Sequence, residues 1–147
     1  MVSMVSSLLA ALVACAYMAC AVKAGGIPDC LSATYYTLKR GWLFTTLMVV
    51  ESALCFPAMW EGTAPCWRWL VVVAALTLCG VGFTPYKHCD KHYKAHYVMA
   101  CIAMASVVVL YMTRGQWYMP MAFLVVGLRK NWLLGVETAL LASCWVY

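Results

Sequence analysis

Three histidines stand close together in the one long polar run of this chain, residues 85–97. His88, His92 and His96 are spaced four residues apart, so on a helix they would lie along one face. Two histidines four residues apart can reach one metal ion, whereas His88 and His96 would be ~12 Å apart along the axis. We therefore take His92 and His96 as candidate ligands of a metal ion such as zinc.

A complete metal site would need further ligands from another segment, and Cys30 or Asp29 could supply them. The alternative is that these histidines lie among lysines at a membrane surface. There they would carry a proton part of the time and contact lipid phosphates.

Two glutamates, Glu51 and Glu137, lie inside apolar runs. A carboxylate in hydrocarbon costs about 2.5–3.5 kcal/mol, so such a residue usually faces a partner or a water-filled cavity. Ser32, His96 and Glu137 are predicted at similar depth, and could form a catalytic cluster with a nucleophile or a proton relay. Glu51 is predicted deeper, and with Glu137 could line an ion pathway. The alternative for each carboxyl is a hydrogen bond that holds helices together.

The composition sets the fold class that must position these residues. The chain has 147 residues, of which 66% are hydrophobic and 10% charged. Soluble domains have about 45–50% apolar and about 25% charged residues, so a bilayer suits this chain better than water. We expect an all-α, polytopic transmembrane helical bundle that forms a single domain over residues 1–147.

The apolar runs predict about six spans. They cover residues 1–22, 41–60, 69–83, 96–113, 116–128 and 131–147. The fifth run would rise only ~20 Å as a helix, so it either thins the bilayer or re-enters without crossing. Between the first two spans, we expect Asp29 or Ser32 to cap a short interfacial helix, with Tyr35 and Tyr36 at the level of the headgroups.

The basic residues predict the orientation. The loops after the first, third and fifth spans hold eight Lys and Arg residues, and the other two loops hold two. By the positive-inside rule, both termini lie outside and the histidine run faces the cytoplasm. A re-entrant fifth segment would reverse the last span.

The net charge of +5 and the nine cysteines exclude some classes of protein. The basic residues are scattered between apolar runs, which favours anionic lipid headgroups over nucleic acid as their partner. Most cysteines lie inside apolar runs, where they behave as small hydrophobic residues rather than as a disulfide framework. The expected partners are the lipid bilayer and either a second protein or further copies of this chain.

Several short motifs resemble those of known proteins. They are Ile27–Pro28, the run Leu31–Tyr36, the opening His96-Tyr97-Val98 of the fourth span, and Trp132 with Glu137. Together they resemble a group of small uncharacterised bacterial inner-membrane proteins, which implies the same location for this chain.

A more distant similarity is to the alkaline ceramidase and adiponectin-receptor superfamily of seven-span zinc hydrolases. It rests on a polar serine and on a histidine that opens a span. Members use a Ser, an Asp and three His from separate helices, whereas here the histidines share one segment and no Asp lies in a span. The similarity implies zinc as a cofactor and hydrolysis of lipid amides or esters.

Three functions therefore remain open. The first is a membrane protein whose cytoplasmic polar cluster, Ser32, His96 and Glu137, binds a lipid headgroup, a small ligand or a proton, or anchors a partner. The second is a metal-dependent hydrolase of lipids, with histidine ligands and Glu137 as base. The third is a proton or ion pathway through Glu51 and Glu137.

Overall fold

The computed structural model describes residues 2–38, 40–84 and 91–116, and every regular element in these ranges is helical. There are four long helices, and short helical turns connect the first to the second and the second to the third. In chain order the elements are α1 (Val2–Gly25), η1 (Leu31–Ala33), α2 (Thr34–Thr37), α3 (Gly41–Gly62), η2 (Pro65–Trp67), α4 (Arg68–Phe83) and α5 (Tyr93–Thr113). The predicted all-α class is confirmed.

Four helices are long and apolar enough to cross a membrane, namely 3–25, 41–62, 65–83 and 93–113. They correspond to the first four predicted spans, and their ends differ from the predicted ones by three residues or fewer, except where η2 extends the third span. The predicted fifth and sixth spans, 116–128 and 131–147, lie outside the described residues. The count of about six spans therefore stays a prediction.

Glycines in the left-handed region end two of these helices. Gly26 has φ 78° directly after α1, and its N–H donates to the carbonyl of Val22 at 2.8 Å. Gly115 has φ 72° after α5, and the N–H of Gln116 reaches back to the carbonyl of Tyr111 at 3.0 Å. Because only glycine adopts this conformation without strain, the chain stops each helix at a defined point.

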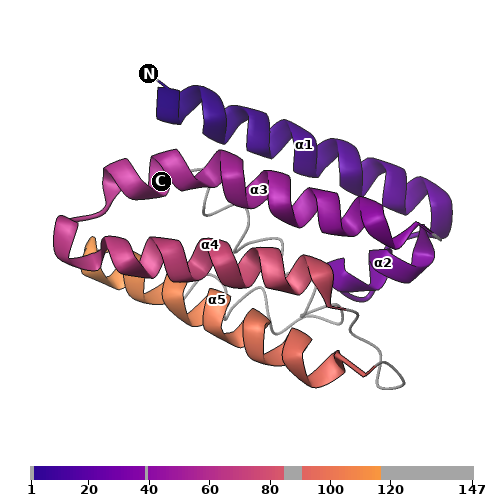
Figure 1. Cartoon of the computed structure of the whole chain (residues 1–147). Helices are drawn as coiled ribbons and strands as arrows, with labels where there is room; N and C mark the ends of the chain where they lie inside the picture. The colour runs from indigo at the N-terminus through magenta and orange to yellow at the C-terminus, as the bar shows by residue number, and fades with distance from the viewer. Residues whose placement is uncertain (1, 39, 85–90, 117–147) are drawn as a thin grey trace.

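The long helices run antiparallel to their neighbours in the bundle (Figure 1). The C-terminal ends of α1 and α4 lie at the same end as the N-terminal ends of α3 and α5, and η1 and α2 are placed there too. We call this end the basic end, because the exposed residues Lys23, Arg40, Lys91 and Lys94 belong to it. The η2 turn and Arg114 lie at the opposite end.

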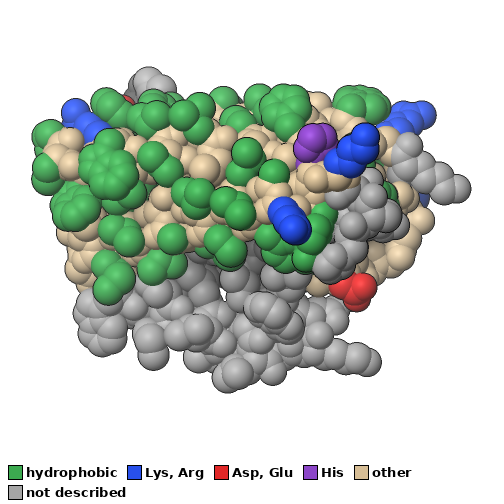
Figure 2. All heavy atoms as spheres, turned by 60° about the horizontal axis from the view of Figure 1, so that its bottom comes forward, with side chains coloured by type: hydrophobic (Ala, Val, Ile, Leu, Met, Phe, Trp, Pro, Cys, Tyr) green, Lys and Arg blue, Asp and Glu red, His purple; other side chains and the backbone are tan. Residues whose placement is uncertain are grey.

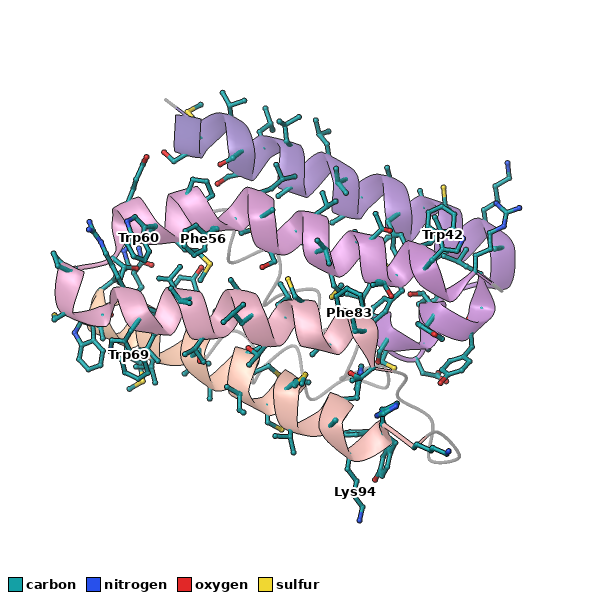
Figure 3. All side chains as sticks on the ribbon, in the orientation of Figure 1. Trp42, Phe56, Trp60, Trp69, Phe83 and Lys94 are labelled. Carbon is teal, nitrogen blue, oxygen red and sulfur yellow. The ribbon has the colours of Figure 1, made fainter. Side chains whose placement is uncertain are left out.

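The outer surface of the helices is apolar between these two ends. Figure 2 shows hydrophobic side chains along the described helices, with Lys and Arg side chains at the left end and over the right half. In Figure 3, Trp60 and Trp69 lie at the opposite end, and Trp42 lies at the basic end. This arrangement of an apolar girdle with tryptophans at both borders is typical of membrane-spanning bundles.

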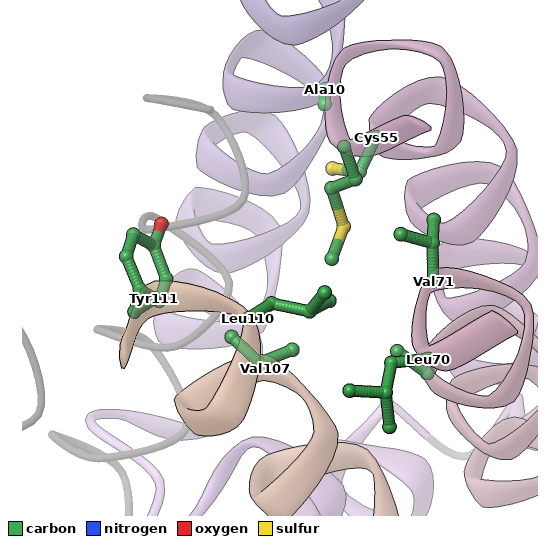
Figure 4. Packing of buried hydrophobic residues seen from close by; sticks show 9 residues of the cluster. Ala10, Cys55, Leu70, Val71, Val107, Leu110 and Tyr111 are labelled. Carbon is green, nitrogen blue, oxygen red and sulfur yellow. The ribbon is translucent and has the colours of Figure 1, made fainter. Parts of the chain in front are cut away.

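Two apolar clusters fill the interior, one toward each end. The cluster at the opposite end, seen in Figure 4, joins all four long helices. It consists of Ala10, Cys55, Met59, Leu70, Val71, Ala74, Val107, Leu110 and Tyr111. The cluster at the basic end consists of Leu31, Phe44, Leu47, Met48 and Val81.

Two hydroxyl groups of α3 bind the backbone of α4. The Thr45 hydroxyl donates to the carbonyl of Gly82 at 2.6 Å, and the Ser52 hydroxyl donates to the carbonyl of Ala75 at 3.0 Å. At Gly82 the two helices are so close that an added Cβ would lie 2.8 Å from the Cβ of Met48. Both bonds join positions seven residues apart on each helix, so they set the antiparallel register of α3 and α4.

We predict that Thr45→Val destabilises the bundle by about 0.6–1.7 kcal/mol, because valine keeps the shape but removes the interhelical hydrogen bond. Thr46→Val is the matched control, since Thr46 is the exposed neighbour on the same helix. Unfolding in mixed detergent micelles measures the free energy of both variants. Equal effects at Thr45 and Thr46 would show that the bond to Gly82 does not contribute.

Candidate functional site

Ser32 lies in η1 at the basic end, and its side chain is buried with 4% of its surface exposed. Its hydroxyl lies 3.3 Å from the thiol of Cys30, which is also buried. η1 is held inside the bundle because Leu31 belongs to the apolar cluster of this end. A hydroxyl and a thiol, both capable of nucleophilic chemistry, are therefore placed side by side at the basic end.

The short helix after Ser32 forms as expected, but the predicted cap is wrong. Cys30 occupies the N-cap position of η1, and Ala33 occupies that of α2, with no side-chain capping hydrogen bond at either. Ser32 lies within the 3-10 turn, so its hydroxyl turns to Cys30 instead, and Asp29 is exposed. The 3-10 turn leads directly into α2, so no extended residue stands between them to act as a cap.

His96 is buried in the first turn of α5, with 4% of its surface exposed. Its Nδ1 lies 2.8 Å from the carbonyl oxygen of Thr84, just after α4. A carbonyl oxygen only accepts, so Nδ1 carries the proton, and in the neutral imidazole Nε2 holds the lone pair. His96 thus ties the end of α4 to the start of α5.

His92 differs from His96 although it lies only one turn earlier. It is exposed at the N-cap position of α5, and His88 lies outside the described residues. Within residues 2–38, 40–84 and 91–116, no three His, Cys, Asp or Glu side chains come together in a group that could hold a metal ion. The described residues alone thus do not supply the ligand set of a zinc hydrolase, and the zinc hypothesis requires residues beyond them.

Glu137 lies outside the described residues, so the cluster of Ser32, His96 and Glu137 stays a prediction. The structure places Ser32 and His96 at the same end of the bundle, each with a polar partner in its own neighbourhood: Cys30 for Ser32 and Thr84 for His96. Glu51 lies away from both, in the middle of α3, and its side chain has 0% of its surface exposed.

The basic end has one further polar contact, between Tyr17 and Thr34, which the sequence did not predict. The Tyr17 hydroxyl lies 2.6 Å from Oγ1 of Thr34, and this oxygen lies 2.5 Å from the carbonyl of Leu31. The threonine has one proton to donate, and the carbonyl needs it, so Tyr17 is the donor to Thr34. The only signal in the sequence is a tyrosine within the apolar run of the first span, and nothing pairs it with a residue seventeen positions later.

No family model, characterised protein or solved structure matches this chain.

We predict that His96→Ala lowers the free energy of unfolding by about 1–3 kcal/mol, because it removes a buried ring and its bond to Thr84. His92→Ala is the matched control and should change stability by less than about 0.5 kcal/mol, since His92 is exposed. Thermal unfolding in detergent measures both variants. A larger loss for His92→Ala than for His96→Ala would contradict the positions of the two rings.

We also predict that Tyr17→Phe exposes Cys30. Loss of the bond to Thr34 loosens η1 by about 1 kcal/mol, which raises the rate of Cys30 alkylation roughly fivefold. A membrane-permeant maleimide and peptide mapping measure this rate, because several other cysteines are exposed and react regardless. Tyr97→Phe, at an exposed tyrosine of α5, is the control. An unchanged rate at Cys30 would contradict a role for Tyr17 in closing this end.

Proposed function

We propose that this chain is a small multi-pass membrane protein whose basic end binds anionic lipid headgroups. The observation that carries the proposal is the distribution of charge over the bundle. Lys23, Arg40, Lys91 and Lys94 are all exposed at the basic end, and Asp29 is the acidic residue described there. Each exposed Lys or Arg near an anionic lipid surface contributes about 1 kcal/mol of attraction.

The opposite end is less suited to this role. Its described cations are Arg68 and Arg114, and the guanidinium of Arg68 lies 5.1 Å from the centre of the Trp60 ring. The Nε of Arg68 also donates to the carbonyl of Thr63 at 3.3 Å. These contacts hold Arg68 against the protein, so it is less available to a lipid phosphate.

The same asymmetry supports an orientation. By the positive-inside rule, the basic end faces the cytoplasm and the N-terminus, which begins α1 at the opposite end, faces outside. We further propose the bacterial inner membrane as the location, in line with the resemblance of the short motifs. Ser32 and His96 would then lie beneath the headgroups, buried within the basic end.

We predict that the protein binds phosphatidylglycerol more tightly than phosphatidylcholine, and that Lys91→Gln with Lys94→Gln weakens binding of the anionic lipid. About 1 kcal/mol for each lysine corresponds to roughly a 25-fold loss for the pair. Lipid titration of the detergent-purified protein, followed by native mass spectrometry, measures the affinity. Arg68→Gln is the control and should cause a smaller loss.

Three results would contradict this proposal. Equal affinity for the two lipids would show that charge does not select the ligand. Stoichiometric zinc in the purified protein, lost in the His92→Ala and His96→Ala double variant, would instead favour the lipid hydrolase. Competition by inorganic phosphate at millimolar concentration would identify a soluble phosphate compound, rather than the lipid, as the ligand of the same cations.

A further inference from the structure

The short connection between α1 and α3 is inserted into the basic end of the bundle. We call its residues 27–38 the strap, which contains η1 and α2. Cys30, Leu31, Ser32 and Thr34 of the strap are all buried. Leu31 belongs to the apolar cluster of this end, together with residues of α3 and with Val81 of α4. The strap therefore reaches from the end of α1 into the core between α3 and α4.

The strap owes its fold to contacts with the long helices. Its two helical elements are three and four residues long, and neither has a side-chain capping hydrogen bond. Helices this short are not stable in isolation. Three contacts hold the strap in place: the bond between Tyr17 and Thr34, the packing of Leu31, and the ring of Tyr35 at 6.2 Å from that of Phe44. A segment held in this way opens and closes as a unit.

Two glycines let α2 lie directly against the ends of the long helices. A Cβ added to Gly25, in the last turn of α1, would collide with the side chain of Thr37. A Cβ added to Gly41, the first residue of α3, would collide with the ring of Tyr35. Tyr35 and Thr37 share one turn of α2, so the end of α1 and the start of α3 meet the same short helix (Figure 1).

A cation stands beside each of these two contacts. Lys23 lies in the last turn of α1, two residues before Gly25, and Arg40 is the N-cap residue of α3, directly before Gly41. Both are exposed, and neither forms an ion pair with another described residue. The closed strap thus holds two positive charges on either side of α2. Their repulsion opposes closure, and an anion that binds both of them removes that cost.

From these observations we infer that an anionic lipid bound by Lys23 and Arg40 keeps the strap closed, and so controls access to the Cys30 thiol and the Ser32 hydroxyl on its buried side. The inference rests on the lipid binding proposed above and names its regulatory effect. A phosphate accepts hydrogen bonds from both an ammonium and a guanidinium group. Because one headgroup contacts both cations only when the strap is closed, its binding shifts the equilibrium toward the closed state.

The alkylation rate of Cys30 reports the position of the strap. The protein is reconstituted into vesicles of phosphatidylcholine, with or without phosphatidylglycerol, and treated with a membrane-permeant maleimide before peptide mapping. We expect phosphatidylglycerol to slow the alkylation of Cys30 about tenfold, because two cations gain an anionic partner in the closed state. Cys20, an exposed thiol of α1 near the same end, is the internal comparison. Its rate reports the direct effect of surface charge on the thiol reaction.

Two double variants separate the cations beside the strap from the others at the same end. Lys23→Gln with Arg40→Gln should give equal Cys30 rates in the two kinds of vesicle, because the lipid no longer distinguishes the closed from the open strap. Lys91→Gln with Lys94→Gln is the matched control, since these two exposed lysines lie at the start of α5 and not beside α2. In vesicles rich enough in phosphatidylglycerol to saturate the protein, the control should keep the slow Cys30 rate.

Four outcomes would overturn the inference. Phosphatidylglycerol that binds in native mass spectrometry but leaves the Cys30 rate unchanged would refute the control of the strap and leave the proposed function intact. Equal affinity for the two lipids, with an unchanged Cys30 rate, would refute both. Slowing that persists after Lys23→Gln with Arg40→Gln would show that the lipid acts through other residues. Slowing by millimolar inorganic phosphate in phosphatidylcholine vesicles would show that a free phosphate, and not the lipid, holds the strap.

Discussion

The satisfaction of polar groups inside an apolar helical bundle governs this structure. A helix closes its own backbone hydrogen bonds, so a mostly apolar chain can bury its backbone in lipid only as helices or as a closed barrel. The hydroxyl groups follow the same constraint within the described bundle. Thr45, Ser52 and Thr77 each donate to a helix carbonyl, and Tyr17 donates to Thr34. Several buried hydroxyls of the described residues therefore have a hydrogen-bond partner, and some of these partners belong to another helix.

Interhelical hydroxyl bonds have a second consequence, because they set how the helices align. Apolar side chains alone give little reason for one register over another, since lipid tails solvate them as well as neighbouring helices do. The pair of bonds from α3 to α4 selects one register and brings Gly82 against Met48. That register decides which residues of α4 stand beside Glu51.

Charge divides the molecule along its length. The described lysines and arginines lie at the two ends, with the exposed ones at the basic end, and the buried ionisable residues Glu51 and His96 lie inside helices. The candidate site at the basic end and the carboxyl at mid-span therefore lie in different environments, one near the exposed cations and one between the two apolar clusters. Each can be changed without touching the residues of the other.

Periodic and compositional signals predicted the helices well. The four described long helices begin and end near the predicted limits because apolar length, Gly26 and Gly115 mark them locally. The burial of Glu51 was also foreseeable, since a polar residue inside an apolar run has few alternatives. That neither Asp29 nor Ser32 caps the short helix could not be predicted, because the packing of Leu31 into the core decides how that turn lies.

The sequence by itself therefore determined the all-helical class, the extent of these four helices and the concentration of positive charge toward one end, since each depends on neighbouring residues along the chain. Only the tertiary structure decided the partners: Tyr17 with Thr34, Ser32 with Cys30, His96 with Thr84, and Ser52 with Ala75. The physical reason is that most of these bonds join segments far apart in sequence. Their formation depends on how helices pack and on register, which no local pattern of residues specifies.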